Sequence, residues 1–116
     1  MTNASSSFGH ELEPFRVDVH PERETVRVVP VGEIDMATVG QVDERMQDLR
    51  NVGFRDFVLD LREVRFMDSS GLRLILGWDA HARENGISFA LIEGPAGVQR
   101  VFEITGVLDD LPFVGR

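Results

Sequence analysis

The chain has 116 residues, which is the size of one domain, and 42% hydrophobic with 28% charged residues is typical of a folded globular protein. Its formal net charge of −8 disfavours direct nucleic-acid binding and docking on an anionic membrane. All 12 basic residues are arginine and there is no cysteine, which excludes lysine-based sites, disulfides and cysteine-ligated zinc. With no apolar run long enough to span a membrane and no signal-peptide pattern, we expect a cytoplasmic protein. We predict a flexible tail over residues 1–10 and one domain over residues 11–116.

The first half of the domain predicts an antiparallel hairpin. Apolar residues alternate with polar ones over 15–19, which is typical of a half-buried strand. His-Pro-Glu at 20–22 predicts a turn, and β-branched residues over 25–31 predict a second strand. Pro30 should lie near the end of that strand, where the ladder needs no N–H donor.

An amphipathic helix and a buried strand are predicted next. Asp35 or Thr38 is expected to cap the helix, and Gly53 to end it. Its apolar face comprises Val39, Val42, Met46 and Leu49. The apolar run over 57–61 predicts a central strand, and 64–67 a short extended piece.

The second half alternates helices with strands. We predict a helix over 72–84 ended by Asn-Gly, a strand over 87–92, a helix that starts at Gly94-Pro95, and a last short strand within 108–114. A helix lies between each pair of later strands, so those strands should be parallel. The fold class is therefore α/β with a small mixed sheet.

Sites for enzymatic chemistry are weakly represented. His10, His20 and His81 lack the spacing of a metal site, and we expect them on the solvated surface. Neither a Gly-x-Ser-x-Gly turn nor a glycine-rich phosphate loop is present, so we expect no cofactor. Asp60, at the end of a buried strand, invites comparison with the phospho-acceptor of receiver domains. Such a domain also needs a lysine that this chain lacks, so a structural role is favoured.

A second candidate site is Asp68-Ser69-Ser70-Gly71, between a strand and a helix. These residues are typical of a helix N-cap. A phosphoryl group on either serine would add about −1.5 to −2 charges at a helix N-terminus, where the dipole tolerates them. Together with Asp68, Glu33 and Asp35 it would form a negative patch that a docking partner would sense.

The helix after this segment shows further features. Ser69, Arg73 and Gly77 are spaced to lie on one side. A glycine inside a helix lowers helix stability, so we expect Gly77 to be compensated by a close approach of another backbone. That backbone belongs either to a binding partner or to a crossing element of the same chain. Trp78 is interpreted as a core residue, with an interface anchor as the alternative.

Three segments resemble the STAS domain of bacterial anti-sigma-factor antagonists. Residues 61–77 (LREVRFMDSSGLRLILG) are similar to the family's central signature. Gly-Glu-Ile-Asp at 32–35 with Thr38 is similar to its motif after the second strand, and 102–107 (FEITGV) to its third. The resemblance implies a mixed sheet with helices mainly on one face.

The resemblance also implies a function without catalysis. The unphosphorylated antagonist would bind an anti-sigma factor that is also a serine kinase and so release a sigma factor. Phosphorylation of Ser69, supported by neighbouring Ser70, would end binding, and a PP2C-type phosphatase would reset it. Residues implied at the phosphosite and docking surface are Asp68, Gly71, Glu33, Asp35, Thr38 and Gly77. A monomer or weak dimer is expected.

Two residues, Arg73 and Trp78, depart from the family pattern. The family commonly has a small residue at the position of Arg73, and we expect this arginine to pair with a phosphate on Ser69. Trp78 lies where a polar residue is expected. The alternatives are a STAS scaffold in a sensory complex or transporter, and a receiver-like enzyme.

Overall fold

A mixed six-stranded sheet organises residues 14–115, which are the residues described by the computed structural model. The elements in chain order are β1 (Arg16–Glu22), β2 (Thr25–Ile34), α2 (Val39–Asn51), β3 (Asp56–Asp60), β4 (Val64–Met67), α3 (Ser69–Asn85), β5 (Ser88–Ile92), α4 (Ala96–Ile104), the 3₁₀ turn η1 (Leu108–Asp110) and β6 (Phe113–Val114). The predicted tail over 1–10 lies outside the described residues.

The sheet has the predicted mixture of strand directions. Its strand order is β1-β2-β3-β5-β6, with β1 and β2 antiparallel and the other pairs parallel. β2 pairs with β3 over Thr25–Val28 and then with β4 over Gly32–Ile34. Pro30, predicted near the end of its strand, lies instead in the interior of β2, where it pairs with Val17 of β1 and falls between the ladders to β3 and β4.

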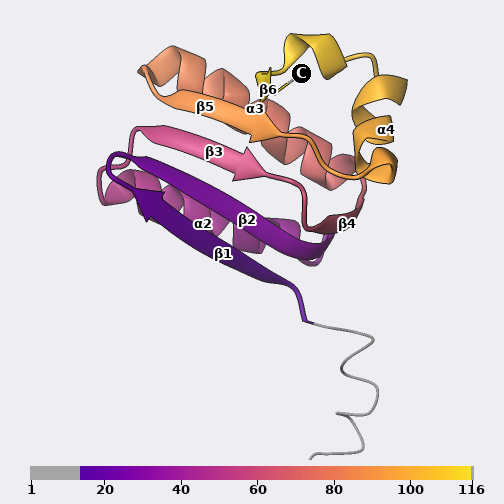
Figure 1. Cartoon of the computed structure of the whole chain (residues 1–116), viewed down its shortest axis with the longest axis horizontal. Helices are drawn as coiled ribbons and strands as arrows, with labels where there is room; N and C mark the ends of the chain where they lie inside the picture. The colour runs from indigo at the N-terminus through magenta and orange to yellow at the C-terminus, as the bar shows by residue number, and fades with distance from the viewer. Residues whose placement is uncertain (1–13, 116) are drawn as a thin grey trace, which may run out of the picture.

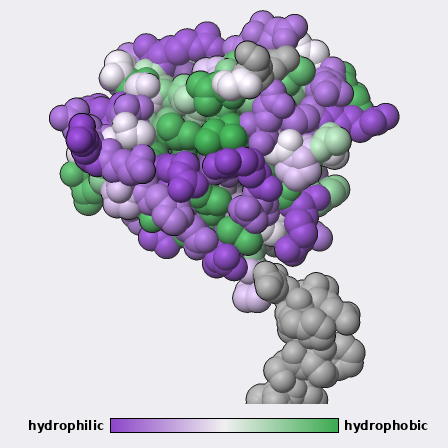
Figure 2. Space-filling view, viewed as in Figure 1, coloured by the Kyte–Doolittle hydropathy of each residue, from purple (hydrophilic) through white to green (hydrophobic). Residues whose placement is uncertain are grey.

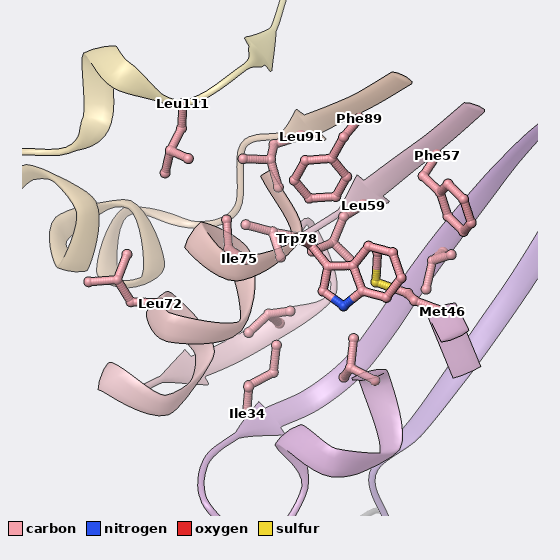
Figure 3. Close-up of a cluster of buried hydrophobic side chains, with 14 of the residues drawn as sticks. Ile34, Met46, Phe57, Leu59, Leu72, Ile75, Trp78, Phe89, Leu91 and Leu111 are labelled. Atoms are coloured by element: carbon pink, nitrogen blue, oxygen red, sulfur yellow. The ribbon is translucent and has the colours of Figure 1, made fainter. Parts of the chain in front are cut away.

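The helices cover mainly one face of the sheet, as predicted. Figure 1 shows α2 and α3 behind the strands, with α4 at the end of the sheet beside β4. Buried side chains between these layers form one core, seen in Figure 3, in which Phe57, Leu59 and Leu91 meet Met46 and Ile75 from the helices. On the opposite face, hydrophobic side chains at the centre are flanked by hydrophilic ones (Figure 2).

The predicted hairpin turn is wrong by three residues. His20, Pro21 and Glu22 belong to β1 and pair with residues of β2, and the turn follows at Arg23, which has a φ of 63°. Pro21 is compatible with this strand because β1 is at the sheet edge, where an N–H donor is not required on the open side.

Other boundaries differ because of tertiary pairing and capping. β2 continues past the predicted end at residue 31 to Ile34, since β4 pairs with its last residues. α3 begins at Ser69 rather than at Leu72, because Asp68 caps it. The predicted last strand is mostly the turn η1, and only Phe113–Val114 pairs with β5. The helix ends predicted at Gly53 and at Gly86 of Asn-Gly are confirmed within two residues, and both glycines have positive φ.

Candidate functional site

Two loops that are distant in sequence meet at the start of α3. β4 runs beside the end of β2, which places Ile34 opposite Met67. Directly after this pair, the N–H of Asp68 donates to the carbonyl of Ile34 over 3.2 Å. The segments 32–35 and 68–71, which the sequence singled out separately, therefore form one surface.

Asp68 is the N-cap of α3 and holds the first turn together. Its Oδ1 accepts hydrogen bonds from the N–H of Ser70 at 2.8 Å and from the Ser70 hydroxyl. The hydroxyl bond contributes most to lowering the pKa of Asp68, and the Ser70 N–H adds to it. The carboxylate therefore stays ionised at neutral pH.

The two adjacent serines have different surroundings. The side chain of Ser70 faces inward, is 7% exposed and donates its hydroxyl to Asp68. Ser69 is exposed, and its Oγ lies 3.4 Å from Nη1 of Arg73, one turn along the helix. Only the Ser69 hydroxyl is thus presented to a protein that approaches this end of α3.

The loop after β2 is ordered by its own polar side chains. Thr38 donates its hydroxyl to the carbonyl of Glu33 at 2.7 Å. Oδ1 of Asp35 accepts from the N–H groups of Ala37 at 2.9 Å and Thr38 at 3.2 Å. Thr38 occupies the N-cap position of α2 without a side-chain bond to the helix, and the side chain of Asp35 bonds the turn before it, so the side-chain cap expected from Asp35 or Thr38 is wrong. Glu33 is exposed beside this loop.

The two glycines of α3 have opposite environments. A Cβ on Gly71 would lie 2.4 Å from Cγ of Met67 and 3.0 Å from Cγ2 of Ile34, so Gly71 lets the helix approach the two loops. A Cβ on Gly77 would meet no atom within 4 Å. The close intramolecular crossing expected as one explanation for Gly77 is therefore wrong.

Gly77 instead lines an open groove between α2 and α3. The groove has a volume of about 600 Å³ and extends to the start of α3, because Ser70 and Arg73 also line it. Its other lining residues are Met36, Val39, Gly40, Asp43, Gln47, Arg50, Leu74, Trp78 and His81. Sequence periodicity placed Val39 in the apolar stripe of α2 but did not identify this groove, which depends on how the two helices pair.

Trp78 forms the floor of the groove and is a core residue, as favoured from the sequence. It is 6% exposed, and Figure 3 shows its ring beside Met46 and Leu59. Its Nε1–H donates to Oδ1 of Asp43 at 2.8 Å, so the one polar atom of this buried indole has a hydrogen-bond partner. The guanidinium of Arg50 lies 5.6 Å from the ring centroid.

In the part of the chain that the structure describes, neither His20 nor His81 lies in a cluster of metal-ligating side chains. His81 is half-buried rather than solvated, with Nε2 3.0 Å from Nη1 of Arg50. His20 is exposed on β1, and His10 lies outside the described residues. Across residues 14–115 no cluster of three metal-ligating side chains occurs, and none of the helices there is long and apolar enough to cross a membrane.

Asp60 has the structural role favoured for it. The side chain is 2% exposed and accepts hydrogen bonds from Arg27 at 3.0 Å and from Arg62 at 2.8 Å. Burial alone would raise the pKa of Asp60, but the bonds from Arg62 and Arg27 outweigh it, and the net shift is downward. A carboxylate enclosed by two arginines is not presented to a phosphodonor.

The fold and the joined loops define a class of regulatory domain, and the comparisons agree. The family model described as "Mlab, STAS domain" matches residues 15–114. The anti-sigma-B factor antagonist of Staphylococcus aureus (strain NCTC 8325 / PS 47) is 35% identical over 78 residues, 67% of this chain and 72% of that protein. The chain belongs to the STAS domain family.

Solved structures of anti-sigma factor antagonists share the fold. One from Mycobacterium paratuberculosis aligns with a TM-score of 0.74 at 22% identity, over 89% of this chain and 87% of the other. The anti-sigma factor antagonist SpoIIAA in its unphosphorylated form aligns with a TM-score of 0.70 at 24% identity, over 87% and 86% of the two chains. The predicted mixed sheet and helix arrangement are confirmed by this likeness.

Proposed function

We propose that this protein is an anti-sigma-factor antagonist whose binding is switched by phosphorylation of Ser69. In its unphosphorylated form it binds an anti-sigma factor with serine kinase activity and thereby releases a sigma factor. Phosphorylation ends the complex, and a PP2C-type phosphatase restores the hydroxyl. The protein itself supplies the acceptor and the docking surface, works in the cytoplasm as a monomer or weak dimer, and needs no cofactor.

The contrast between the two serines carries this proposal. Ser69 is exposed beside an intact N-cap, whereas the hydroxyl of Ser70 is buried and donated to Asp68. Because the cap is completed by Asp68 and Ser70, a phosphoryl group on Ser69 leaves the capping bonds in place. The fold is retained, and only the charge of the surface changes.

The docking surface has a physical basis in the residues around Ser69. The loop that contains Glu33 and Asp35 is fixed by the Thr38 hydroxyl and lies beside the start of α3. A partner that contacts both loops would meet about two extra negative charges after phosphorylation. Such a like-charge change is enough to separate partners that were complementary before it.

The test is mass spectrometry after incubation with ATP and the candidate anti-sigma kinases of the source organism. A single phosphate on Ser69, with loss of the kinase complex on gel filtration, is expected. Ser69→Ala should bind without being modified, Ser69→Asp should bind weakly, and the control Ser70→Ala should still be modified on Ser69. Stable binding without any phosphate would instead favour a scaffold, and phosphate on Ser69→Ala would refute the site.

A further inference from the structure

The strongest additional feature is the arginine one turn after Ser69. We propose that Arg73 is the phosphate-binding residue of this switch: when Ser69 is phosphorylated, the Arg73 guanidinium closes onto the phosphate and withdraws its positive charge from the mouth of the α2–α3 groove. The inference rests on the proposed function, since it assigns the group that holds the phosphate placed on Ser69. It names a phosphoserine-binding site within the same helix.

The helix N-terminus has few N–H groups to offer a phosphate. Ser70 donates its N–H to the carboxylate of Asp68 at 2.8 Å. The N–H groups of Gly71 and Leu72 donate to the carbonyl of Asp68 at 3.1 and 3.4 Å. Bare helix N-termini bind anions through such groups, but here the cap already uses them. A phosphate held by the protein, rather than by water alone, would therefore take its hydrogen bonds from another donor.

The local charge makes a cation necessary as well. Asp68 directly precedes Ser69, and the Ser70 hydroxyl bond keeps the pKa of Asp68 low. A phosphate of about −1.5 to −2 charges would be added next to this ionised carboxylate. Without a cation, the two groups would repel at short range.

Arg73 has the position and the chemistry to meet both needs. Nη1 is already 3.4 Å from Oγ of Ser69, at the spacing where side chains meet on a helix surface. The planar guanidinium presents paired donors that match phosphate oxygens. The ion pairs within 4.0 Å that the structure shows for residues 14–115 involve other arginines. After the bonds from Ser70, the charge of Arg73 also contributes to lowering the pKa of Asp68, so its guanidinium already acts on the negative charge at this end of α3.

Binding the phosphate would change the groove. Arg73 lines it at the end near Ser70, whereas Arg50 contacts His81 and the ring of Trp78. Pairing with the phosphate would neutralise the first of these positive charges. A partner would then meet a changed groove mouth as well as a changed Ser69, because the net charge of the Ser69–Arg73 pair changes from +1 to between about −0.5 and −1.

The decisive experiment installs phosphoserine in place of Ser69 during translation, so that no kinase is required. Urea unfolding of the modified and unmodified chains, each with Arg73 or with Arg73→Gln, forms a double-mutant cycle. We expect phosphate and Arg73 to be coupled by roughly threefold to tenfold in the folding equilibrium constant, with less coupling at 1 M salt. Arg73→Lys should retain part of it.

A matched control is Arg45→Gln, on the side of α2 that lies with Val17 and Asp48 rather than in the groove. It should show no coupling to the phosphate. ¹⁵N NMR should also show the Arg73 Nε resonance shifting on modification while that of Arg45 stays in place. Coupling no larger than that of Arg45 with an unshifted Arg73 resonance would overturn the inference.

Failure of this inference and failure of the proposed function give different results. If a kinase modifies Ser69 but the cycle shows no coupling, the switch stands and Arg73 has no role in it. If the cycle shows coupling but no kinase of the organism modifies Ser69, the phosphate-binding geometry stands and the proposed function fails.

Discussion

Replacing each glycine of α3 by alanine should have opposite effects on the free energy of unfolding. Both positions lie in one helix and both gain the same methyl group. At Gly77 the methyl would meet no atom within 4 Å. The variant therefore gains only helix propensity, about 1 kcal/mol, because alanine loses less backbone entropy than glycine on folding.

At Gly71 the same methyl enters a filled space. It would lie 2.4 Å from Cγ and 2.8 Å from Sδ of Met67, and 3.0 Å from Cγ2 of Ile34. Met67 is 3% exposed and Ile34 is 1% exposed, so neither side chain can move into solvent. Overpacking of this kind costs about 1–3 kcal/mol, which exceeds the propensity gain near a helix end. We expect Gly71→Ala to lose about 1 kcal/mol or more.

The assay is urea unfolding followed by far-UV circular dichroism, with Trp78 fluorescence as a second probe. The chain has a single tryptophan, so the fluorescence reports on the surroundings of Trp78, where α3 meets Asp43 of α2 and Phe57 of β3. A change of 1 kcal/mol corresponds to about 4 °C in Tm for a domain of this size. The reasoning is refuted if Gly71→Ala is as stable as the parent, or if Gly77→Ala is less stable.

Three further predictions concern buried polar contacts. Ser70→Ala should raise the pKa of Asp68 toward its ordinary value, because the hydroxyl that stabilises the carboxylate is lost; an unchanged carboxyl titration by ¹³C NMR would contradict this. The pKa of Asp60 in the folded protein lies below the value of about 3.9 that it has in the unfolded chain. The ion pairs of Asp60 therefore stabilise the fold fully above about pH 3.9, and this stabilisation is lost as the pH falls through the lower pKa of the folded protein. Asp60→Asn should therefore cost about 2 kcal/mol at pH 7 and progressively less below pH 4 in urea titrations, and an equal cost at both pH values would count against the ion pairs. Asp43→Ala should leave Nε1 of Trp78 without its acceptor, cost about 1–2 kcal/mol and shift the emission of Trp78, whereas unaltered emission would argue against this bond.

Local signals in the sequence determined most of the fold correctly. The apolar spacing over 39–49 predicted α2, with Val42 and Met46 fully buried. Glycines after the helices predicted their ends because they adopt the positive φ that ends a helix. Alternation of helices and strands then led to the parallel part of the sheet without knowledge of any contact.

Boundaries set by distant partners could not be predicted in this way. His20–Glu22 extends β1 because residues 25–27 lie opposite, and proline is tolerated there only since the strand is at an edge. β2 reaches Ile34 because β4, thirty residues later, pairs with it. The groove depends likewise on Trp78 reaching Asp43 across 35 residues of sequence. No local pattern encodes such contacts.

The candidate site shows why two identical neighbours require a structure to be distinguished. Successive residues of an α-helix point about 100° apart, so the adjacent serines cannot both face the core. Ser70 is the serine that faces inward, because its N–H and its hydroxyl both donate hydrogen bonds to the carboxylate of Asp68. Because the cap holds Ser70 toward the interior, the side chain of Ser69 points away from it, toward solvent. A stable first turn and an exposed hydroxyl at Ser69 are consequences of the same hydrogen bonds.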